Sequence, residues 1–239
     1  MPRCGYKLLC PILKKNKYYE YDNKQMELKQ NFKVGILAFG SLINDPGEEL
    51  KALEVMRIDC ETPFKIEFAR ISSIRCKAPT LIPVNEKAKG KMVNAKIIIL
   101  NEGVTLEQAK SILWRRECRI NDKTKTYIEP TKPTTKSMLI GEYDNLQNVE
   151  KVIYTYFLTQ TDYGDLTPDR LASFAIESIL SDCGKNKTDG IRYLLSTKEN
   201  GITTELSDEY EKSILTKTKC NSLSEAIIKL DIERQMKKI

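Results

Sequence analysis

One carboxylate interrupts a row of apolar residues between residues 105 and 120. The members of the row recur three or four residues apart: Leu106, Ala109, Leu113, Glu117 and Ile120. Residues at these spacings share one face of an α-helix. The pattern therefore predicts a helix that turns Glu117 toward the core.

The 239-residue chain contains no histidine. This excludes Ser-His-Asp triads, Cys-His pairs and zinc sites built on histidine. An enzyme of this composition that acts near neutral pH must move protons with a carboxylate, a cysteine or a lysine. Glu117 is then a candidate general base. Taken alone, a glutamate in this position is more often structural: Glu117 would then end the apolar row and pair with a neighbouring arginine.

The pair Gly40-Ser41 ends the apolar run of residues 35–39. A glycine here can supply the unusual φ of a plain strand-to-helix turn. Alternatively, successive amides at such a turn can bind an anion or a carbonyl oxygen. Ser41 is not expected to be a nucleophile, because no Gly-x-Ser-x-Gly motif surrounds it and no imidazole can activate it.

Two further side chains suggest other chemistry. Arg70 continues the inward row of the alternating segment 63–75, where it could bind a carboxylate or mark the point at which the strand leaves the core. Cys118 lies close to several arginines, which lower the pKa of a thiol, so cysteine-based catalysis is an alternative. Its position next to Glu117, however, takes it off the apolar row.

The elements that position these residues begin at residue 33. Alternation and apolar runs predict strands at 34–39, 63–75, 80–84, 91–100, 137–143 and 151–159, with 80–84 and 91–100 forming a hairpin that turns near Gly90. Two interior helices are expected. One starts with Asp45 as N-cap and continues its buried stripe to Arg57; the other starts with Thr105 as N-cap and Gln108 closing a capping box.

After residue 163 the sequence is typical of capped helices. One begins at Thr167-Pro168-Asp169 and runs to about Cys183, a second covers residues 207–218, and a third follows the capping box Ser222–Glu225. The chain thus divides into an N-terminal arm (1–32), a core domain (33–162) and a helical extension (163–239). The expected fold class is α+β, with about six strands curling into a small mixed β-barrel flanked by helices.

Composition limits the partners and the location. The net charge is +6 with a pI near 8.8, but charges of both signs are interleaved, which favours no nucleic-acid partner. No apolar run reaches the roughly 18 residues of a membrane helix, and no signal peptide is recognisable. Seven cysteines without a Cys-x-x-Cys pair indicate free thiols and a cytoplasmic protein. Neither a metal nor a cofactor is expected.

The motifs in order resemble the gamma-glutamylcyclotransferase-like (AIG2-like) superfamily. Phe39-Gly40-Ser41-Leu42 is similar to that family's Tyr-Gly-Ser-Leu loop. The strand 97–100, the helix bearing Trp114-Arg115-Arg116-Glu117, and Tyr127 resemble the family's following strand, its acid/base helix and the tyrosine beyond it. The resemblance covers about residues 33–160.

The resemblance implies cleavage of a γ-glutamyl amine or peptide to 5-oxoproline and a free amine. It implies Glu117 as general acid/base and a substrate pocket formed by Phe39, Gly40, Ser41 and Leu42, with Arg70 as a further candidate for carboxylate binding. The partner is then a small γ-glutamyl molecule; neither glutathione specificity nor an oligomeric state follows. An alternative is a non-catalytic ligand-binding or interaction module on the same fold, since Phe39 replaces the motif's tyrosine.

Overall fold

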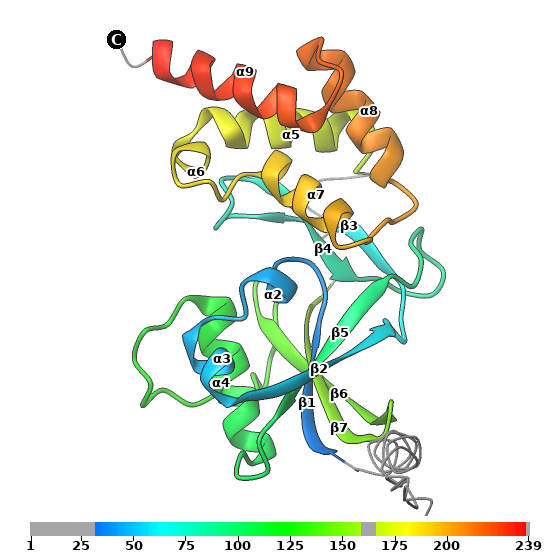
Figure 1. Cartoon of the computed structure of the whole chain (residues 1–239), viewed down its shortest axis with the longest axis vertical. Coiled ribbons are helices and arrows are strands. Elements are labelled where there is room, and N and C mark those ends of the chain that lie inside the picture. The colour runs from blue at the N-terminus through cyan, green and yellow to red at the C-terminus, as the bar shows by residue number, and fades with distance from the viewer. Residues whose placement is uncertain (1–31, 159–165, 238–239) are drawn as a thin grey trace, which may run out of the picture.

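The computed structural model describes residues 32–158 and 166–237. The predicted arm of residues 1–32 lies outside them, except for Phe32. Figure 1 shows a sheet in one half of the molecule, flanked by α3 and α4, and a layer of helices in the other half. The α+β class is therefore confirmed.

The larger sheet has five strands in the order β2-β5-β1-β7-β6. Their bounds are β1 Phe32–Ala38, β2 Glu54–Glu61, β5 Asn94–Leu100, β6 Met138–Leu146 and β7 Val149–Phe157. The central strand β1 runs antiparallel to β5 and parallel to β7. Ile36 and Leu37 point to opposite faces and are 0% and 1% exposed, so the prediction of a strand buried on both faces is confirmed.

Strands β3 (Ile66–Ser72) and β4 (Ala78–Pro83) form a separate two-stranded sheet. The predicted hairpin across Gly90 is wrong, because β4 pairs with β3 while β5 pairs with β1 and β2. Arg57 belongs to β2, not to a helix. The described strands thus make a five-stranded sheet and a two-stranded hairpin, and the small mixed β-barrel of about six strands is not confirmed.

Three helices flank the larger sheet: α2 Ser41–Asn44, α3 Glu48–Leu53 and α4 Leu106–Cys118. The Thr105 N-cap of α4 is confirmed, with its hydroxyl accepting from the Gln108 amide and the Gln108 side chain accepting from the Thr105 amide. The predicted Asp45 cap is wrong. Gly47, at φ +80°, precedes α3, and Asp45 ends the short α2.

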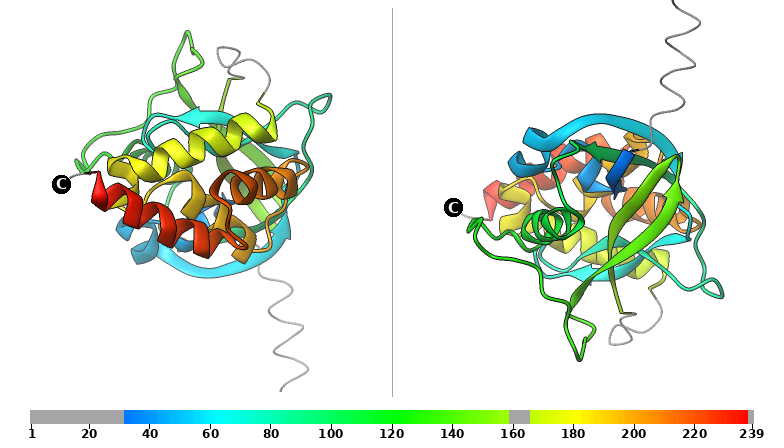
Figure 2. Two further views of the ribbon diagram at one scale, coloured as in Figure 1. Left: turned by 90° about the horizontal axis from the view of Figure 1, so that it is seen from above. Right: turned by 90° about the horizontal axis from the view of Figure 1, so that it is seen from below.

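The described residues after Leu166 form helices and their connections: α5 Pro168–Leu180, α6 Asp182–Lys185, α7 Gly190–Glu199, α8 Ser207–Thr218 and α9 Leu223–Met236. The starts of α5 and α9 and both ends of α8 are confirmed, although α5 ends before Cys183. Helix α7 was not predicted. Figure 2 shows α5, α8 and α9 as one layer seen from above, and α5 and α7 contact β4.

A disulfide joins Cys76, at the tip of the β3–β4 hairpin, to Cys183 in α6. Their Cα atoms are 6.0 Å apart and 107 residues separate them in sequence. The prediction of free thiols is therefore wrong for this pair, while Cys60, Cys118 and Cys220 are free. Such bridges are rare in a reducing cytosol, so the cytoplasmic location stays a prediction.

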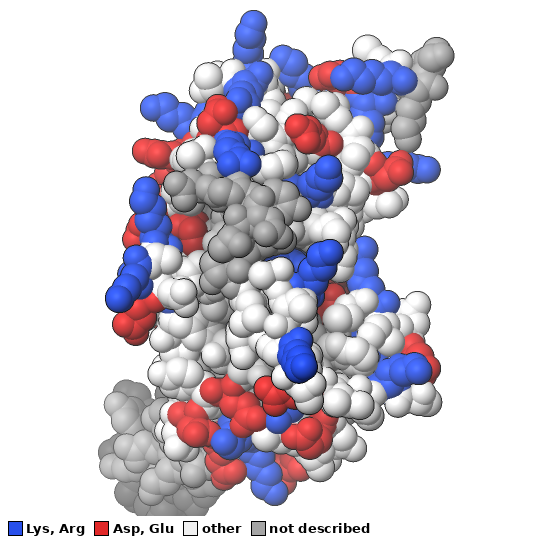
Figure 3. Space-filling model, turned by 180° about the vertical axis from the view of Figure 1, so that it is seen from behind, with Lys and Arg blue, Asp and Glu red and all other residues white. Residues whose placement is uncertain are grey.

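Two surface properties bear on possible partners. None of the helices in residues 32–158 and 166–237 is long and apolar enough to cross a membrane. Figure 3 shows basic and acidic side chains interspersed over the face seen from behind, with acidic groups gathered toward its lower end. The basic excess therefore forms no single stripe on that face.

The Glu67 side chain of β3 forms hydrogen bonds that connect the hairpin to the helical layer. Its side chain is buried, and it accepts hydrogen bonds from the amide of Phe68, the hydroxyl of Thr204 and the amide of Leu206. Thr204 and Leu206 lie in the connection between α7 and α8. Burial raises the pKa of the Glu67 carboxyl above its usual range, and these hydrogen bonds oppose the rise.

We expect Glu67→Gln to lower the free energy of unfolding by about 1–3 kcal/mol, because the amide nitrogen would face one of these donors. The loss should be larger at acid pH. Because the pKa of Glu67 is raised in the folded state, the wild type loses stability as the pH rises from 4.5, the ordinary pKa of the group, through the raised pKa. A glutamine at this position does not titrate, so the variant does not lose stability over that pH range. Urea unfolding at acid pH and at neutral pH measures the difference. Glu86→Gln is the control, because Glu86 is exposed and its replacement should leave the free energy of unfolding unchanged.

Candidate functional site

A cavity of about 980 Å³ lies where the loop after β1, the C-terminal end of α4, the β3–β4 hairpin and α7 meet. Five of the six residues predicted for the site line it: Phe39, Ser41, Leu42, Arg70 and Glu117. The sixth, Gly40, lies in the loop between Phe39 and Ser41. Residues far apart in the sequence thus surround one space large enough for a small molecule.

The loop after β1 depends on glycine at position 40. Gly40 has φ +67° and ψ −135°, a conformation that disfavours other residues. A Cβ built on Gly40 would lie 2.5 Å from Oη of Tyr193 in α7. Within the described residues, the amide nitrogens of Ser41 and Leu42 donate to no acceptor. A ligand that binds these amides would therefore displace no acceptor among the described residues.

We expect Gly40→Ala to lower the free energy of unfolding by about 1–3 kcal/mol, because the methyl group meets Tyr193 and the φ is unfavourable. Adding Tyr193→Phe should recover only the part due to the hydroxyl contact. Gly103→Ala is the matched control, since its Cβ would have nothing closer than 3.5 Å. Thermal and urea unfolding of the variants measure these effects; equal losses at positions 40 and 103 would contradict the interpretation.

Glu117 lies in the last turn of α4, with its side chain 26% exposed. Arg116 Nη1 donates to Glu117 Oε1, and Arg116 Nη2 contacts the Ser41 hydroxyl at 3.4 Å. Arg116 Nη2 also donates to the Asp45 carbonyl. One guanidinium therefore holds the carboxylate and the loop together. The structural interpretation of Glu117 is therefore supported as well, because Glu117 does pair with the neighbouring Arg116.

The adjacent Arg115 binds a different carboxylate, that of Glu49. Its side chain is 7% exposed and forms two hydrogen bonds with the carboxylate of Glu49 in α3, at 3.1 and 2.7 Å. The hydrogen bonding holds the pKa of Glu49 below its usual range. This pair fixes the end of α4 against α3, and so positions the turn that carries Glu117.

Arg70 lines the cavity from β3, with its guanidinium 3.7 Å above the ring of Phe157. A register shift between Phe68 and Arg70 interrupts the alternation of the strand at this point. Phe39 packs edge-on against Phe64, with ring centroids 6.2 Å apart. Both side chains are therefore held by aromatic contacts around the cavity.

Many lining residues were not predicted, and three of them come from the hairpin tip and the unpredicted α7: Arg75, Tyr193 and Ser196. The Ser196 hydroxyl accepts from the side chain of Asn44 in α2 at 3.0 Å, so α7 holds the loop at a second point. A signal for α7 was available. Asp189 caps its first turn through the amides of Ile191 and Arg192, a pattern readable from Asp189-Gly190 before apolar residues.

Cys118 is exposed and is not among the residues that line the cavity. Desolvation by its neighbours and the adjacent charge of Glu117 raise the pKa of its thiol. Both observations disfavour a thiolate nucleophile. Among the described residues no cluster of three or more Cys, Asp or Glu side chains could hold a metal ion.

The lining carries more cations than anions. Eight arginine and lysine residues line the cavity against four acidic ones, Asp45, Glu48, Glu49 and Glu117. An excess of positive charge in a concave, partly desolvated space favours an anionic ligand. Comparison with known proteins adds no assignment: the chain matches no protein-family model, no curated protein and no solved structure.

Proposed function

We propose that this protein is a gamma-glutamylcyclotransferase-type lyase of the gamma-glutamylcyclotransferase-like superfamily, which cleaves a γ-glutamyl amine or peptide to 5-oxoproline and a free amine. The observation that carries the proposal is the shared cavity, in which Glu117 and the loop of Phe39–Leu42 contact the same guanidinium of Arg116. The proposed fold relationship rests on the loop, strand, helix and glutamate occurring in that order.

The chemistry needs no residue that the chain lacks. The α-amine of the substrate attacks its own γ-carbonyl carbon, a C–N bond forms in the five-membered ring, and the original amide C–N bond breaks. Glu117 accepts the proton of the attacking amine and delivers it to the leaving nitrogen. No histidine is required, because the substrate supplies the nucleophile.

The protein's main task is then to hold the amine against the carbonyl. Oriented intramolecular attack contributes up to about 7–11 kcal/mol in favourable cases. The amides of Ser41 and Leu42 would donate to the carbonyl oxygen or to the α-carboxylate, and one oxyanion donor typically contributes about 10²–10³-fold in rate. Arg70, held over Phe157, would add charge for the α-carboxylate.

The proposal is tested with a panel of γ-glutamyl amines, amino acids and peptides, with mass spectrometry for 5-oxoproline. At least one member should give 5-oxoproline and its free amine in equal amounts, without added metal or cofactor. The same panel with the γ-linkage replaced by an α-linkage is the control, because an α-glutamyl amide places the amine wrongly for ring closure. A panel in which no compound is consumed would refute the lyase.

A second candidate is a ligand-binding module on the same fold. Two observations favour it. The Arg116 guanidinium already donates a hydrogen bond to one oxygen of the Glu117 carboxylate, and Phe39 lacks the hydroxyl of the tyrosine that the family's motif has at this position. Such a module would show thermal stabilisation by γ-glutamyl compounds that remain intact after long incubation. Release of 5-oxoproline at any catalytic rate excludes it.

A further inference from the structure

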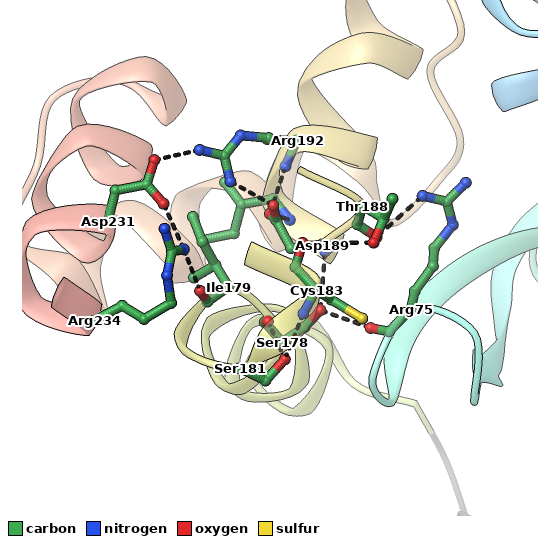
Figure 4. A network of polar contacts seen from close by, with 12 residues as sticks. Arg75, Ser178, Ile179, Ser181, Cys183, Thr188, Asp189, Arg192, Asp231 and Arg234 are labelled. Carbon is green, nitrogen blue, oxygen red and sulfur yellow. Dashed lines mark hydrogen bonds and ion pairs between the residues drawn. The ribbon is translucent and has the colours of Figure 1, made fainter. Parts of the chain in front are cut away.

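The disulfide between Cys76 and Cys183 lies next to the cavity lining. Cys76 directly follows Arg75, a lining residue, at the tip of the β3–β4 hairpin. On the other side, the Cys183 carbonyl accepts a hydrogen bond at 2.8 Å from the amide of Thr188, which also lines the cavity. Figure 4 shows Thr188 and Cys183 beside Arg75. Each half of the bridge is therefore separated from the lining by one peptide bond or one hydrogen bond.

The hairpin tip has a backbone conformation that depends on its surroundings. Cys76 and Lys77 both have a positive φ, of +50° and +64°. Two successive left-handed residues that are not glycine are unfavourable, and they persist only where other contacts hold them. The Lys77 amide donates to the Ser72 carbonyl at 2.9 Å, and the bridge holds the adjacent Cys76. Without the bridge, we expect this turn to relax.

The rest of the hairpin is held by contacts that do not involve the bridge. At the end of β3 away from the tip, Glu67 binds Thr204 and Leu206 in the connection between α7 and α8. Helices α5 and α7 pack on β4. Loss of the bridge should therefore free the tip, residues 73–77, while β3 and β4 remain paired. Such a change alters the cavity lining and leaves the fold intact.

Two hydrogen bonds at the tip are also independent of the sulfur atoms. The Ser178 hydroxyl of α5 donates to the Arg75 carbonyl at 2.6 Å, and the Arg75 guanidinium donates to the Thr188 carbonyl at 3.3 Å. Figure 4 shows both contacts at one end of the polar network around α6 and α7. These bonds give the reduced tip a docked position that it can leave and regain, as a reversible change requires.

The two cysteines differ in exposure. Cys183 is 5% exposed, whereas Cys76 is half-buried and lies between Arg75 and the exposed Lys77. A thiolate from outside would therefore attack the sulfur of Cys76, and the neighbouring cations favour the approach of that anion.

The reduction needs a dithiol and transfers two electrons. When the first thiolate attacks Cys76, the S–S bond breaks, a mixed disulfide forms, and the Cys183 sulfur leaves as a thiolate and takes up a proton. The second thiol of the reductant then attacks the reductant's own sulfur in the mixed disulfide. Cys76 leaves as a thiolate and is protonated, and the dithiol becomes a cyclic disulfide.

We propose that the Cys76–Cys183 bridge is a redox switch of the cavity: the disulfide holds the hairpin tip in the lining, and reduction by a dithiol releases Ile74 and Arg75 from it. In a reducing compartment, the location that the cysteine pattern predicts, the disulfides that do form are typically transient and redox-sensing. The inference does not depend on the lyase, because it concerns the position of the lining and not the identity of the ligand.

Hydrogen–deuterium exchange of the wild type with and without dithiothreitol tests the switch. Reduction should speed exchange in residues 73–78 and 186–190 by about 10- to 100-fold, as expected for a local opening. Peptides from β1 and α4 should change by less than about 2-fold, because these elements do not open with the tip. Re-oxidation should restore the original rates. Alkylation of free thiols, followed by mass spectrometry, shows whether Cys76 and Cys183 are reduced in each sample.

Two variants complete the test. Cys76→Ser combined with Cys183→Ser should exchange at the faster rate with or without reductant, because it cannot form the bridge. Cys118→Ser is the matched control, since Cys118 is exposed and free, and it should respond to reductant as the wild type does. Circular dichroism should be the same for the reduced and the oxidised wild type.

Three results would overturn the switch. If dithiothreitol reduces the bridge only after denaturant is added, the bridge is inaccessible in the folded protein. If exchange rises equally in the tip, β1 and α4, the bridge supports the whole fold and not the tip alone. If the bridge is reduced while residues 73–78 exchange at their original rate, the other contacts hold the tip without it. None of these results bears on 5-oxoproline formation, so the lyase is judged separately.

Discussion

Replacing Glu117 by glutamine is expected to slow 5-oxoproline formation by about 10²–10⁴-fold, the usual contribution of a positioned acid/base. The amide cannot accept the proton of the attacking amine, yet its oxygen can still accept from Arg116 Nη1, so the arrangement of α4 and the loop should persist. Initial rates measured by mass spectrometry at saturating and low substrate distinguish kcat from KM. The loss should fall mainly on kcat.

Glu48→Gln is the matched control for Glu117→Gln. Glu48 also lines the cavity and is also a glutamate paired with a cation, but its side chain is 90% exposed. We expect its rate to remain within about 2-fold of the wild type, as is usual for an exposed ion pair. If Glu117→Gln turns over as fast as the wild type, Glu117 has only the structural role of holding Arg116.

The part of the site that could be predicted from the sequence is local. Helix α4 follows from a capping box and an apolar row within 16 residues, and these signals place Glu117 in its last turn. The turn at Gly40 follows from an apolar run that stops at two small residues, and the structure gives Gly40 the positive φ that such a turn needs. Each signal lies in one short segment, so no knowledge of the tertiary structure was required.

The remaining parts depend on contacts between distant segments. Strand β2 has exposed and half-buried residues without clear alternation, and it forms because β5 pairs with it across about 40 residues. The alternation around β4 and β5 correctly indicates strands but cannot say which partner each one takes. The predicted hairpin failed for this reason, and the predicted barrel is not confirmed, since the described strands form one five-stranded sheet and a separate two-stranded sheet.

For the same reason, the sequence did not reveal the part of the cavity lining that comes from the hairpin tip and α7. Asn44 and Ser196 are 152 residues apart, and Arg75 reaches the cavity only because the hairpin packs against α5 and α7. A sequence lists Arg75 as one more basic residue, and nothing local shows that it stacks on Tyr193. The odd number of cysteines misled in a similar way, since the pairing of Cys76 with Cys183 depends on this packing.

Removing the Cys76–Cys183 bridge is expected to lower the free energy of unfolding by about 2–4 kcal/mol, because the bridge closes a loop of roughly a hundred residues and restricts the unfolded chain. Cys76→Ser with Cys183→Ser should show this loss in urea unfolding, and a dithiol reductant should produce it in the wild type. Peptide mapping without reduction should recover the two cysteines in one cross-linked peptide.

Cys118→Ser provides the control, because Cys118 is exposed and free, and its replacement should change stability by less than about 0.5 kcal/mol. Full stability without the bridge would contradict the prediction, because it would show that packing alone joins the hairpin to α6.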